Sequence, residues 1–366
     1  VTFTEADFRD TTFSEAVFIG TTFSERASFN DVIFLQVVDF SRAVFNGLAE
    51  FTETFFESTS FTHTEFKETT IFEAPKPELL RQRAQTIREK VNRQKIPKIR
   101  KQLEELAQHL EELSRKGTRD SAIVFLFTRF RQPKFVSISG WSFENLSFLR
   151  TDTTEIFLIP EGRTKQILDE KLLRIKEDKP NNREKIFKEK PTLKEAYETV
   201  ERYLNKISVI AEYKNLRKNL ESNRMFTQAA DLFKREMTLT REATSSRIER
   251  FANWFYSAIS EYGESITRPL ILLVSLIIVI TAAIIALMIP TVSTPIDFLI
   301  VIGKSLGMAS SVVFQIKSFS DIKIAEGVAL SDKLPYSLAI EVVVRLLSLI
   351  FIGNLYIALR RRLERK

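Results

Sequence analysis

The sequence predicts a multidomain membrane protein with an N-terminal solenoid, an α-helical middle and two transmembrane helices near the C-terminus. Three observations support this fold class. Phenylalanine recurs at every fifth position early in the chain, the middle has helical periodicity with charged faces, and the last quarter contains long apolar runs. We therefore expect domains at 1–160, 161–262 and 263–366.

Composition excludes several functional classes. The chain of 366 residues has no cysteine, and its only histidines are His63 and His109, so we expect neither a disulfide framework nor a metal centre. The net charge of +7 is spread over helical stretches beside acidic residues, which favours solvated helix faces over nucleic-acid binding. No glycine-rich phosphate loop or nucleophile motif stands out, so we expect no catalytic residues, no cofactor and no enzyme.

The first segment has a period of five, which is neither the helical 3.6 nor the strand 2. A short fixed period predicts a solenoid, in which each unit buries its face against its neighbours. A square coil with one pentapeptide per side explains the pattern: each Phe points inward, and the small residue two positions before it fills the corner. The phenylalanines are Phe3, Phe8, Phe13, Phe18, Phe23, Phe29, Phe34, Phe40, Phe45, Phe51, Phe56, Phe61 and Phe66.

This pattern over residues 1–74 resembles the pentapeptide-repeat family, which implies a right-handed quadrilateral β-helix. Such solenoids serve as rigid binding surfaces or spacers, so the resemblance implies a cytosolic protein partner on the β-helix. The spacing returns at Ile138, Phe143, Phe148, Thr153 and Leu158, which extends the predicted β-helix to residue 160. The stretch 76–119 between these parts has helical periodicity, and we expect it to form an inserted helical hairpin that bends near Pro97.

The helical middle is a predicted coupling region. Residues 161–190 are weakly patterned, with a loop at DKPNN, and residues 191–241 predict two antiparallel helices joined at ESNR. This pair resembles one tetratricopeptide-type repeat, either for peptide binding or as a structural coupler. The aromatic and basic helix 247–262 is expected to lie in the membrane interface, anchored by Trp254 and Phe255, with an ordinary packed helix as the alternative.

The C-terminal domain contains predicted spans at 269–290 and 335–359. The charged region before residue 269 has no export signal, and the tail is rich in arginine. Both termini are therefore expected in the cytoplasm, with the protein multi-pass in the inner (plasma) membrane. Two cytoplasmic ends require an even number of crossings, so we expect the intervening segment 296–320 to be re-entrant and not a third span. Irregular backbone at membrane depth must be enclosed by protein or a water-filled cavity, so several copies are needed.

The order of outer helix, re-entrant loop, inner helix and basic tail resembles the two-span pore domain of the potassium-channel superfamily. Together with the repeats, it is similar to bacterial pentapeptide-repeat ion-channel proteins. The resemblance implies a homotetramer in the lipid bilayer that conducts an inorganic ion. The TVGYG filter of that superfamily is absent, and ASSVVFQIKSFSD stands in its place. Because glycine permits the stacked carbonyls of a potassium filter, we expect no potassium selectivity.

Two groups of residues are candidates for the conduction path. The pore-loop group would form polar rings around the conduction path, and a ring of lysines would raise the barrier to cations. Alternatively, the lysine extends to the outer membrane interface and does not line the pore. The inner-helix group contains an i, i+4 charge pair, which either braces the loop or faces the pore, and an apolar gate nearer the cytosol. The first group is Ser310, Ser311, Gln315 and Lys317, and the second is Glu341, Arg345, Ser348, Ile352 and Leu355.

The alternative function is a non-conducting, membrane-anchored pentapeptide-repeat scaffold. A simple anchor has no use for a polar re-entrant segment, so the conformation of 296–320 discriminates between the two functions.

Overall fold

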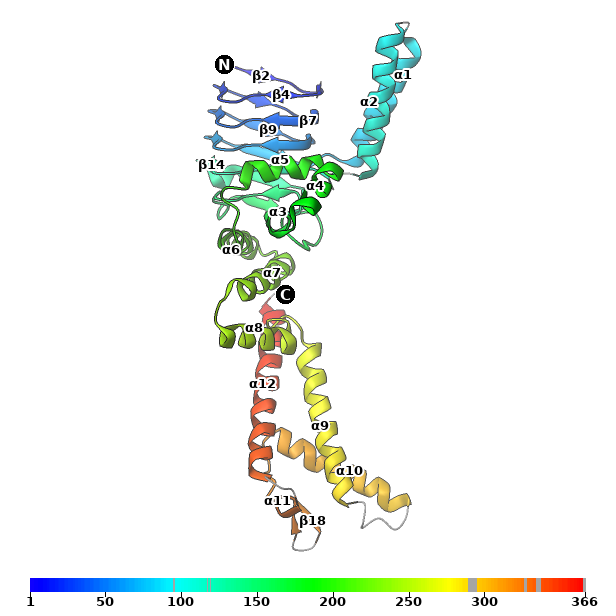
Figure 1. The fold of residues 1–366 in the computed structure, drawn as a ribbon, viewed down its shortest axis with the longest axis vertical. Coiled ribbons are helices and arrows are strands. Elements are labelled where there is room, and N and C mark those ends of the chain that lie inside the picture. Colours follow the sequence, from blue (N-terminus) through cyan, green and yellow to red (C-terminus); the bar gives the residue numbers. More distant parts are fainter. Residues whose placement is uncertain are drawn as a thin grey trace. The chain divides into compact units, whose positions relative to one another are not determined.

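A computed structural model describes residues 1–94, 96–116, 118, 120–288, 295–325, 328–333 and 337–364. Contacts divide the chain into two compact units, Val1–Ala243 and Thr244–Lys366, and each is described by itself. The first unit combines stacked strands with helices, and the second is mainly helical (Figure 1). The helices before Thr244 thus belong with the strands, and the helix at 247–260 belongs with the apolar helices that follow it.

The first unit begins with short strands that pair in parallel (Figure 1). They form three sheets, with the orders β1-β5-β8-β11-β14, β17-β15-β12-β9-β6-β2 and β16-β13-β10-β7-β3. The strands are β1 (Thr2–Phe3), β2 (Ala6–Asp7), β3 (Thr12–Phe13), β4 (Ala16–Val17), β5 (Thr22–Phe23), β6 (Ala27–Ser28), β7 (Ile33–Asp39), β8 (Val44–Phe45), β9 (Ala49–Phe51), β10 (Phe55–Ser60), β11 (Glu65–Phe66), β12 (Thr70–Glu73), β13 (Ala122–Val124), β14 (Arg129–Phe130), β15 (Val136–Ser139), β16 (Leu146–Ser147) and β17 (Phe157–Ile159).

The pairings are consistent with a four-sided coil. Strand β7 bends across two faces, because its start pairs with β3 and its end pairs with β4. Those two faces and the two other sheets make four sides, and the chain returns to the same sheet once per coil. The parallel repeat region is therefore consistent with the predicted β-helix.

Phenylalanine rings form columns inside the coil. The Phe23 and Phe45 rings stack at 4.5 Å, and the Phe29 and Phe51 rings stack at 4.9 Å. Stacked aromatic pairs contribute about 0.5–1.5 kcal/mol each beyond their burial. The Phe125 ring, which follows the helical insertion, stacks on Phe61 at 5.1 Å, so the columns continue across the insertion.

The corners explain the small residues of the repeat. Ala27 and Ala49 are fully buried, as expected for side chains two positions before an inward Phe. Threonine at this position also provides a hydrogen bond to a backbone carbonyl of the preceding coil. The Thr64 hydroxyl donates to the Phe40 carbonyl at 2.8 Å. The Thr54 hydroxyl donates to the Phe29 carbonyl in the same way, at 2.7 Å. These bonds satisfy buried backbone carbonyls between the coils.

Helices α1 (Pro77–Arg93) and α2 (Pro97–Lys116) form an antiparallel hairpin within the range predicted for the insertion. The hairpin covers one face of the coil through the buried side chains Leu80 and Leu110. Their partners are Ile33 and Phe55, which alternate with the inward Phe34 and Phe56 and therefore point out of the coil.

A second group of helices packs at the C-terminal end of the coil. The group comprises α3 (Leu168–Glu177), α4 (Pro180–Glu189), α5 (Pro191–Val200), α6 (Lys206–Ser222) and α7 (Phe226–Ala243), and a short helix η1 (Pro133–Phe135) lies between strands of the coil. Helices α6 and α7 are the predicted antiparallel pair. Helices α3 and α4 lie where the sequence predicted only weak patterning. The predicted DKPNN loop is wrong in its second half: only Asp178 and Lys179 separate the helices, and Pro180 begins α4, where its missing N–H costs nothing.

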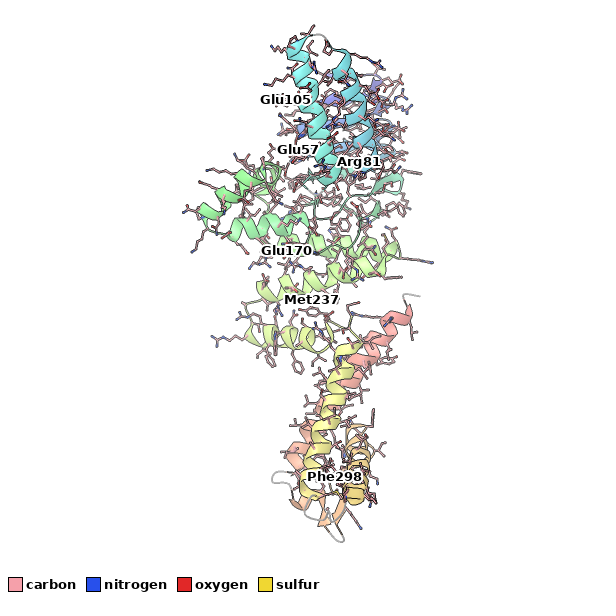
Figure 2. All side chains as sticks on the ribbon, turned by 90° about the vertical axis from the view of Figure 1, so that its right-hand side faces the viewer. Glu57, Arg81, Glu105, Glu170, Met237 and Phe298 are labelled. Atoms are coloured by element: carbon pink, nitrogen blue, oxygen red, sulfur yellow. The ribbon has the colours of Figure 1, made fainter. Side chains whose placement is uncertain are left out.

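Polar side chains from α6 satisfy the backbone of the last coil, which would otherwise present open hydrogen-bonding groups. The Asn219 amide donates to the Ile156 carbonyl at 2.7 Å, and the Glu212 carboxyl accepts from the Phe148 N–H at 2.9 Å. Glu170 on α3, labelled in Figure 2, accepts from the Tyr213 hydroxyl at 2.6 Å. These buried contacts make the helices part of the same unit as the coil.

The second unit contains two helices that are long and apolar enough to cross a membrane, α9 (Thr267–Met288) and α12 (Ser337–Glu364). They match the predicted spans, although residues 289–290 and 335–336 at the span edges lie outside the described residues. The remaining elements are α8 (Arg247–Ser260), α10 (Pro295–Val313), β18 (Lys323–Ala325), β19 (Val328–Ala329) and α11 (Leu330–Lys333).

Candidate functional site

The start of α9 and the end of α12 lie at the same end of the second unit. The Arg361 guanidinium donates to the Tyr262 carbonyl at 2.8 Å and to the Glu264 carboxylate at 3.0 Å. The Glu264 side chain is almost fully buried, whereas the Arg361 side chain is 34% exposed, so this ion pair is shielded from water on the Glu264 side only. Two helices joined at one end in this way form a hairpin, which crosses a bilayer twice if both helices span it.

Helix α10 packs beside the opposite end of α9, where the Ser305 hydroxyl contacts the Met288 sulfur at 3.8 Å. It ends at Val313, and Gln315 then takes a left-handed backbone conformation with a φ of 61°. The Ile316 N–H donates back to the Ser311 carbonyl at 2.7 Å, which closes the end of the helix. The chain therefore turns sharply after α10.

The turn after α10 is held against α12 by the Glu341 and Arg345 side chains. These two side chains pair with each other at 2.8 Å. The Glu341 carboxylate also accepts from the Phe319 N–H at 2.9 Å, and Arg345 donates to the Lys317 carbonyl at 3.3 Å. The predicted charge pair thus contacts the backbone of the predicted loop, as its bracing interpretation requires.

The pore-loop candidates are split between α10 and the turn. Gln315 and Lys317 are exposed and lie in the turn, where the Gln315 amide donates to the Arg345 carbonyl at 3.4 Å. Ser310 and Ser311 are half-buried on the last turn of α10, and the Ser311 hydroxyl bonds within its own helix to the Met308 carbonyl.

The α12 candidates that follow Arg345 in the sequence lie apart from this turn. The Ser348 hydroxyl is buried and donates within its own helix to the Val344 carbonyl at 2.7 Å. Ile352 and Leu355 are half-buried. A rise of 1.5 Å per residue places Leu355 about 15 Å along the helix from Arg345. The structure therefore joins Gln315 and Lys317 to the charge pair and leaves the predicted gate residues separate.

Helix α8, which the sequence predicts at a membrane interface, presents its two predicted anchors differently. Trp254 is 52% exposed, whereas Phe255 packs against the apolar core of the second unit. Helix α8 begins at the cap Ser246, whose hydroxyl accepts from the Glu249 N–H. The exposed Trp254, Phe251 and Ile248 make one apolar surface on α8, which suits a lipid interface.

Sequence reasoning did not identify the junction of Glu264 and Arg361 as a contact. The signal was a glutamate directly before one span and an arginine in the tail after the other, but nothing in a single sequence pairs residues so far apart. Gly263 is required there: it has a φ of 80°, and an added Cβ would lie 3.0 Å from the Tyr256 hydroxyl. Among the described residues, no group of three or more histidine, aspartate or glutamate side chains is placed to hold a metal ion.

Together these features define a protein with N-terminal parallel-sheet repeats and two helices capable of spanning a membrane. Residues 1–44 match the family model for pentapeptide repeats in nine copies, so the chain carries pentapeptide repeats at its N-terminus.

The chain is also similar to an uncharacterized protein of Methanocaldococcus jannaschii, with 35% identity over 247 residues. The match covers 66% of this chain and 50% of that protein, so the chain spans about half the length of its curated relative. No solved structure is significantly similar to the chain.

Proposed function

We propose that the chain is the subunit of a homotetrameric ion channel in the inner (plasma) membrane, with both termini in the cytoplasm. Helices α9 and α12 are the outer and inner helices, and α10 with its following turn forms the re-entrant pore segment. The pentapeptide-repeat region is a cytosolic module that gates or anchors the pore.

The polar turn at 315–319, held against α12 inside the apolar unit, carries this proposal. Backbone groups and charged side chains in hydrocarbon cost several kcal/mol unless protein or water surrounds them. Gln315 and Lys317 are exposed in one copy, so further copies around a watery axis are the environment that suits them. The bonds from Glu341 and Arg345 fix the turn at this position.

The charge at the turn suggests how ions would be selected. A fourfold ring of Lys317 ammonium groups repels cations and favours anions. Asp321 lies close by, and bonds from the Ser318 hydroxyl and N–H lower its pKa, so it stays ionised at neutral pH. Selectivity would then depend on which of these two rings borders the path. Without the TVGYG segment, the channel has little preference for potassium over sodium.

Planar-bilayer recordings in asymmetric potassium chloride test the function. We expect conduction by the purified protein, and a shift of the reversal potential toward the cation limit in Lys317→Glu. Lys323→Glu, in the exposed strand β18, is the matched control and should leave the reversal potential unchanged. An unchanged reversal potential in Lys317→Glu places this side chain outside the path.

A membrane-anchored scaffold is the second candidate. It is favoured by the fact that the Phe319 N–H and the Lys317 and Arg345 carbonyls find partners within one copy. The turn is therefore partly satisfied without an oligomer. Absence of current under every condition, together with a monomer in detergent, would establish the scaffold instead.

A further inference from the structure

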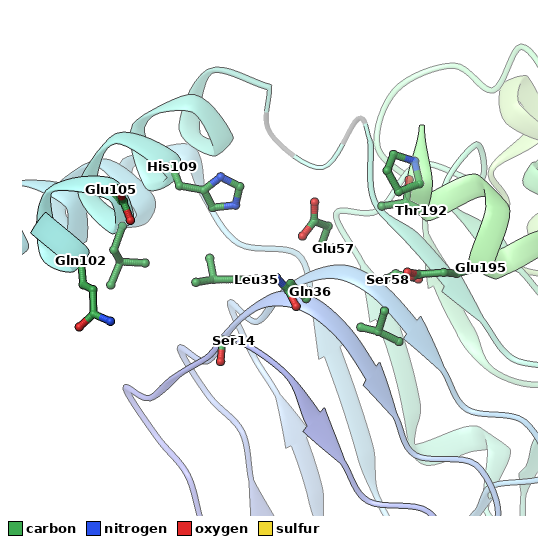
Figure 3. A pocket seen from close by; sticks show the side chains of 13 residues that line it. Ser14, Leu35, Gln36, Glu57, Ser58, Gln102, Glu105, His109, Thr192 and Glu195 are labelled. Atoms are coloured by element: carbon green, nitrogen blue, oxygen red, sulfur yellow. The ribbon is translucent and has the colours of Figure 1, made fainter. Parts of the chain in front are cut away.

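The helical hairpin of α1 and α2 differs between its base and its tip. The base packs on the coil, and beside this contact a groove separates Glu105 and His109 of α2 from Leu35 of β7 (Figure 3). The tip comprises the described residues among 88–101, where α1 ends at Arg93 and α2 begins at Pro97. It extends past the first coil, and most of its side chains are exposed (Figure 1).

Basic side chains near the base are neutralised by the coil. The Lys76 ammonium, just before α1, pairs with Glu53 at 2.6 Å, and the Arg83 guanidinium pairs with Asp10 at 3.0 Å. Pairs within the hairpin are Arg88 with Glu111, Arg100 with Glu104 and Lys101 with Glu105. These carboxylates are therefore already engaged by neighbouring cations.

The tip carries exposed cations without such partners in the described part of the chain. Lys90, Arg93 and Lys98 are exposed, and no described carboxylate pairs with any of them. Of the described residues at the tip, six are basic and only Glu89 is acidic. The tip is therefore a local concentration of positive charge that the hairpin does not neutralise.

Helix stability explains only part of this charge. Lys90 and Arg93 lie in the last turn of α1, where a positive charge interacts favourably with the helix dipole. Lys98 lies in the first turn of α2, where a positive charge is unfavourable, and that turn contains no acidic residue. The basic start of α2 thus costs helix stability, which favours a role in binding.

Exposed apolar side chains lie at the same end of the hairpin. Ile96 is 53% exposed and Ile99 is 39% exposed, whereas Val91 is buried. Isoleucines that stay in contact with water add no hydrophobic stabilisation to the hairpin. A protruding end with both apolar and cationic side chains suits a flat, anionic interface. The isoleucines would enter the headgroup region, while the long cationic side chains reach the phosphates.

We propose that the hairpin tip binds the surface of a bilayer that contains anionic phospholipid. Such surfaces attract polybasic segments, and the attraction grows with each lysine or arginine. In the proposed function α9 and α12 hold the chain at the membrane, which raises the effective concentration of this surface. Nucleic acid would use the charge but not the isoleucines, and the sequence of the tip has no aromatic side chain to stack on bases.

The inference rests on the membrane location in the proposed function but not on conduction. Binding to vesicles can be measured on protein that carries no current. Absence of current with intact vesicle binding would therefore reject the channel alone, and the reverse result would reject the binding by the tip alone.

The test uses the full chain held in nanodiscs of phosphatidylcholine. The chain has no cysteine, so Asn92→Cys places a single thiol at the exposed tip for an environment-sensitive fluorophore. Vesicles of equal parts phosphatidylcholine and phosphatidylglycerol are then added. We expect the nanodiscs to float with these vesicles and the emission of the label to shift to the blue as the tip enters the interface. Vesicles of pure phosphatidylcholine should produce neither effect.

The informative charge variant is Lys90→Gln/Arg93→Gln/Lys98→Gln. It should weaken vesicle binding about a hundredfold, or about fivefold for each cation removed. Raised salt should weaken the binding of the unsubstituted tip as well, because it screens the attraction.

The matched control is Arg81→Gln/Arg115→Gln/Lys134→Gln, which removes the same charge from exposed positions outside the tip. This control should change the affinity less than twofold. Ile96→Ser/Ile99→Ser keeps every charge and should weaken binding about tenfold, because the apolar contribution to interfacial binding is lost.

Several results would overturn the inference. Absence of binding, or equal binding to both kinds of vesicle, would show that anionic lipid is not recognised. Equal weakening by the control would indicate attraction to overall charge. Binding without a shift of the label, or binding that Ile96→Ser/Ile99→Ser leaves unchanged, would place the contact outside the tip. Tighter binding of polyuridylate than of the mixed vesicles would assign the tip to nucleic acid.

Discussion

At the residue scale, Asp169 and Glu212 form an unusual pair of buried carboxyls between the last coil and α6. Asp169 accepts from the Ser147 hydroxyl at 2.8 Å, and Glu212 accepts from the Phe148 N–H. Their other oxygens, Asp169 Oδ2 and Glu212 Oε2, have no hydrogen-bond donor among the described residues. Burial raises the pKa of both carboxyls, and the neighbouring Asp169 carboxyl raises the pKa of Glu212 further. The pair therefore keeps a proton to a higher pH than the same carboxyls do in the unfolded chain.

This pair predicts a pH dependence of stability. The unfolded carboxyls titrate near pH 4, whereas the folded pair keeps its proton to higher pH. The folded state therefore binds more protons in this window, and the free energy of unfolding should fall as pH rises from about 4 toward the raised pKa values. Urea unfolding at several pH values, followed by fluorescence of the buried Trp141 in a Trp254→Phe background, measures it.

Glu212→Gln is the informative variant for this prediction. The amide keeps an acceptor for the Phe148 N–H and supplies a donor toward Asp169. We expect the decline of stability with pH to become shallower in this variant. An equally steep decline in the variant would mean that other groups cause it.

At the scale of elements, the alternation along β7 decides what each residue does. Phe34 points into the aromatic columns and stacks on Phe13 at 5.3 Å, whereas its neighbour Ile33 points outward beneath the hairpin. The same strand therefore serves two apolar cores. The period of five predicted the inner core, but the outer one requires knowledge of which face the hairpin covers.

Two substitutions should separate these cores. Phe34→Asp buries a charge in the columns and should abolish folding of the solenoid, since an unpaired buried charge costs far more than the marginal stability of a domain. Ile33→Asp should instead detach the hairpin and leave the columns in place. Circular dichroism reports the first effect, and new tryptic cleavage at Arg93 or Lys98 reports the second. Soluble, folded Phe34→Asp protein would contradict the β-helix.

How much the sequence could predict differs between elements. The repeats, the two long apolar helices and the hairpin follow local patterns, so they were predictable from single-sequence periodicity. Helices α3 and α4 were not, because the apolar side chains of α3, such as Leu172, are buried by elements distant in sequence. At the site, Lys317 and Arg345 were chosen on separate grounds, and only the folded chain brings them together. The sequence also could not separate the unpaired cations of the hairpin tip from the paired ones at its base, because the pairing carboxylates Asp10 and Glu53 belong to the coil.

At the scale of the whole molecule, the second unit is a two-helix hairpin with a polar turn packed against it. Such an arrangement leaves charged groups on an apolar surface in one copy, including Lys304 on α10. In the channel that we propose, neighbouring copies would surround these charged groups. The oligomeric state is therefore the property on which the channel proposal depends most.

Native mass spectrometry in detergent should find four copies. The matched variant Lys317→Glu should remain a tetramer, because it alters the ring charge and not the packing of α9 against α12. A monomer or dimer of the wild-type protein over a range of mild detergents would contradict the channel.

The stacking of coils across the inserted hairpin has a consequence for the order of folding. The corner bond from Thr64 to Phe40 joins residues 24 positions apart, whereas the equivalent bond from Thr128 to Phe61 spans 67 positions. Closing the longer loop costs about 1 kcal/mol more in chain entropy. We therefore expect the early coils to stack on one another faster than the coils that follow the hairpin, whose closure spans the longer loop. Because α1 and α2 shorten the distance between the two ends of the insertion, their formation is expected to speed the addition of the last coils and of the helices that close them.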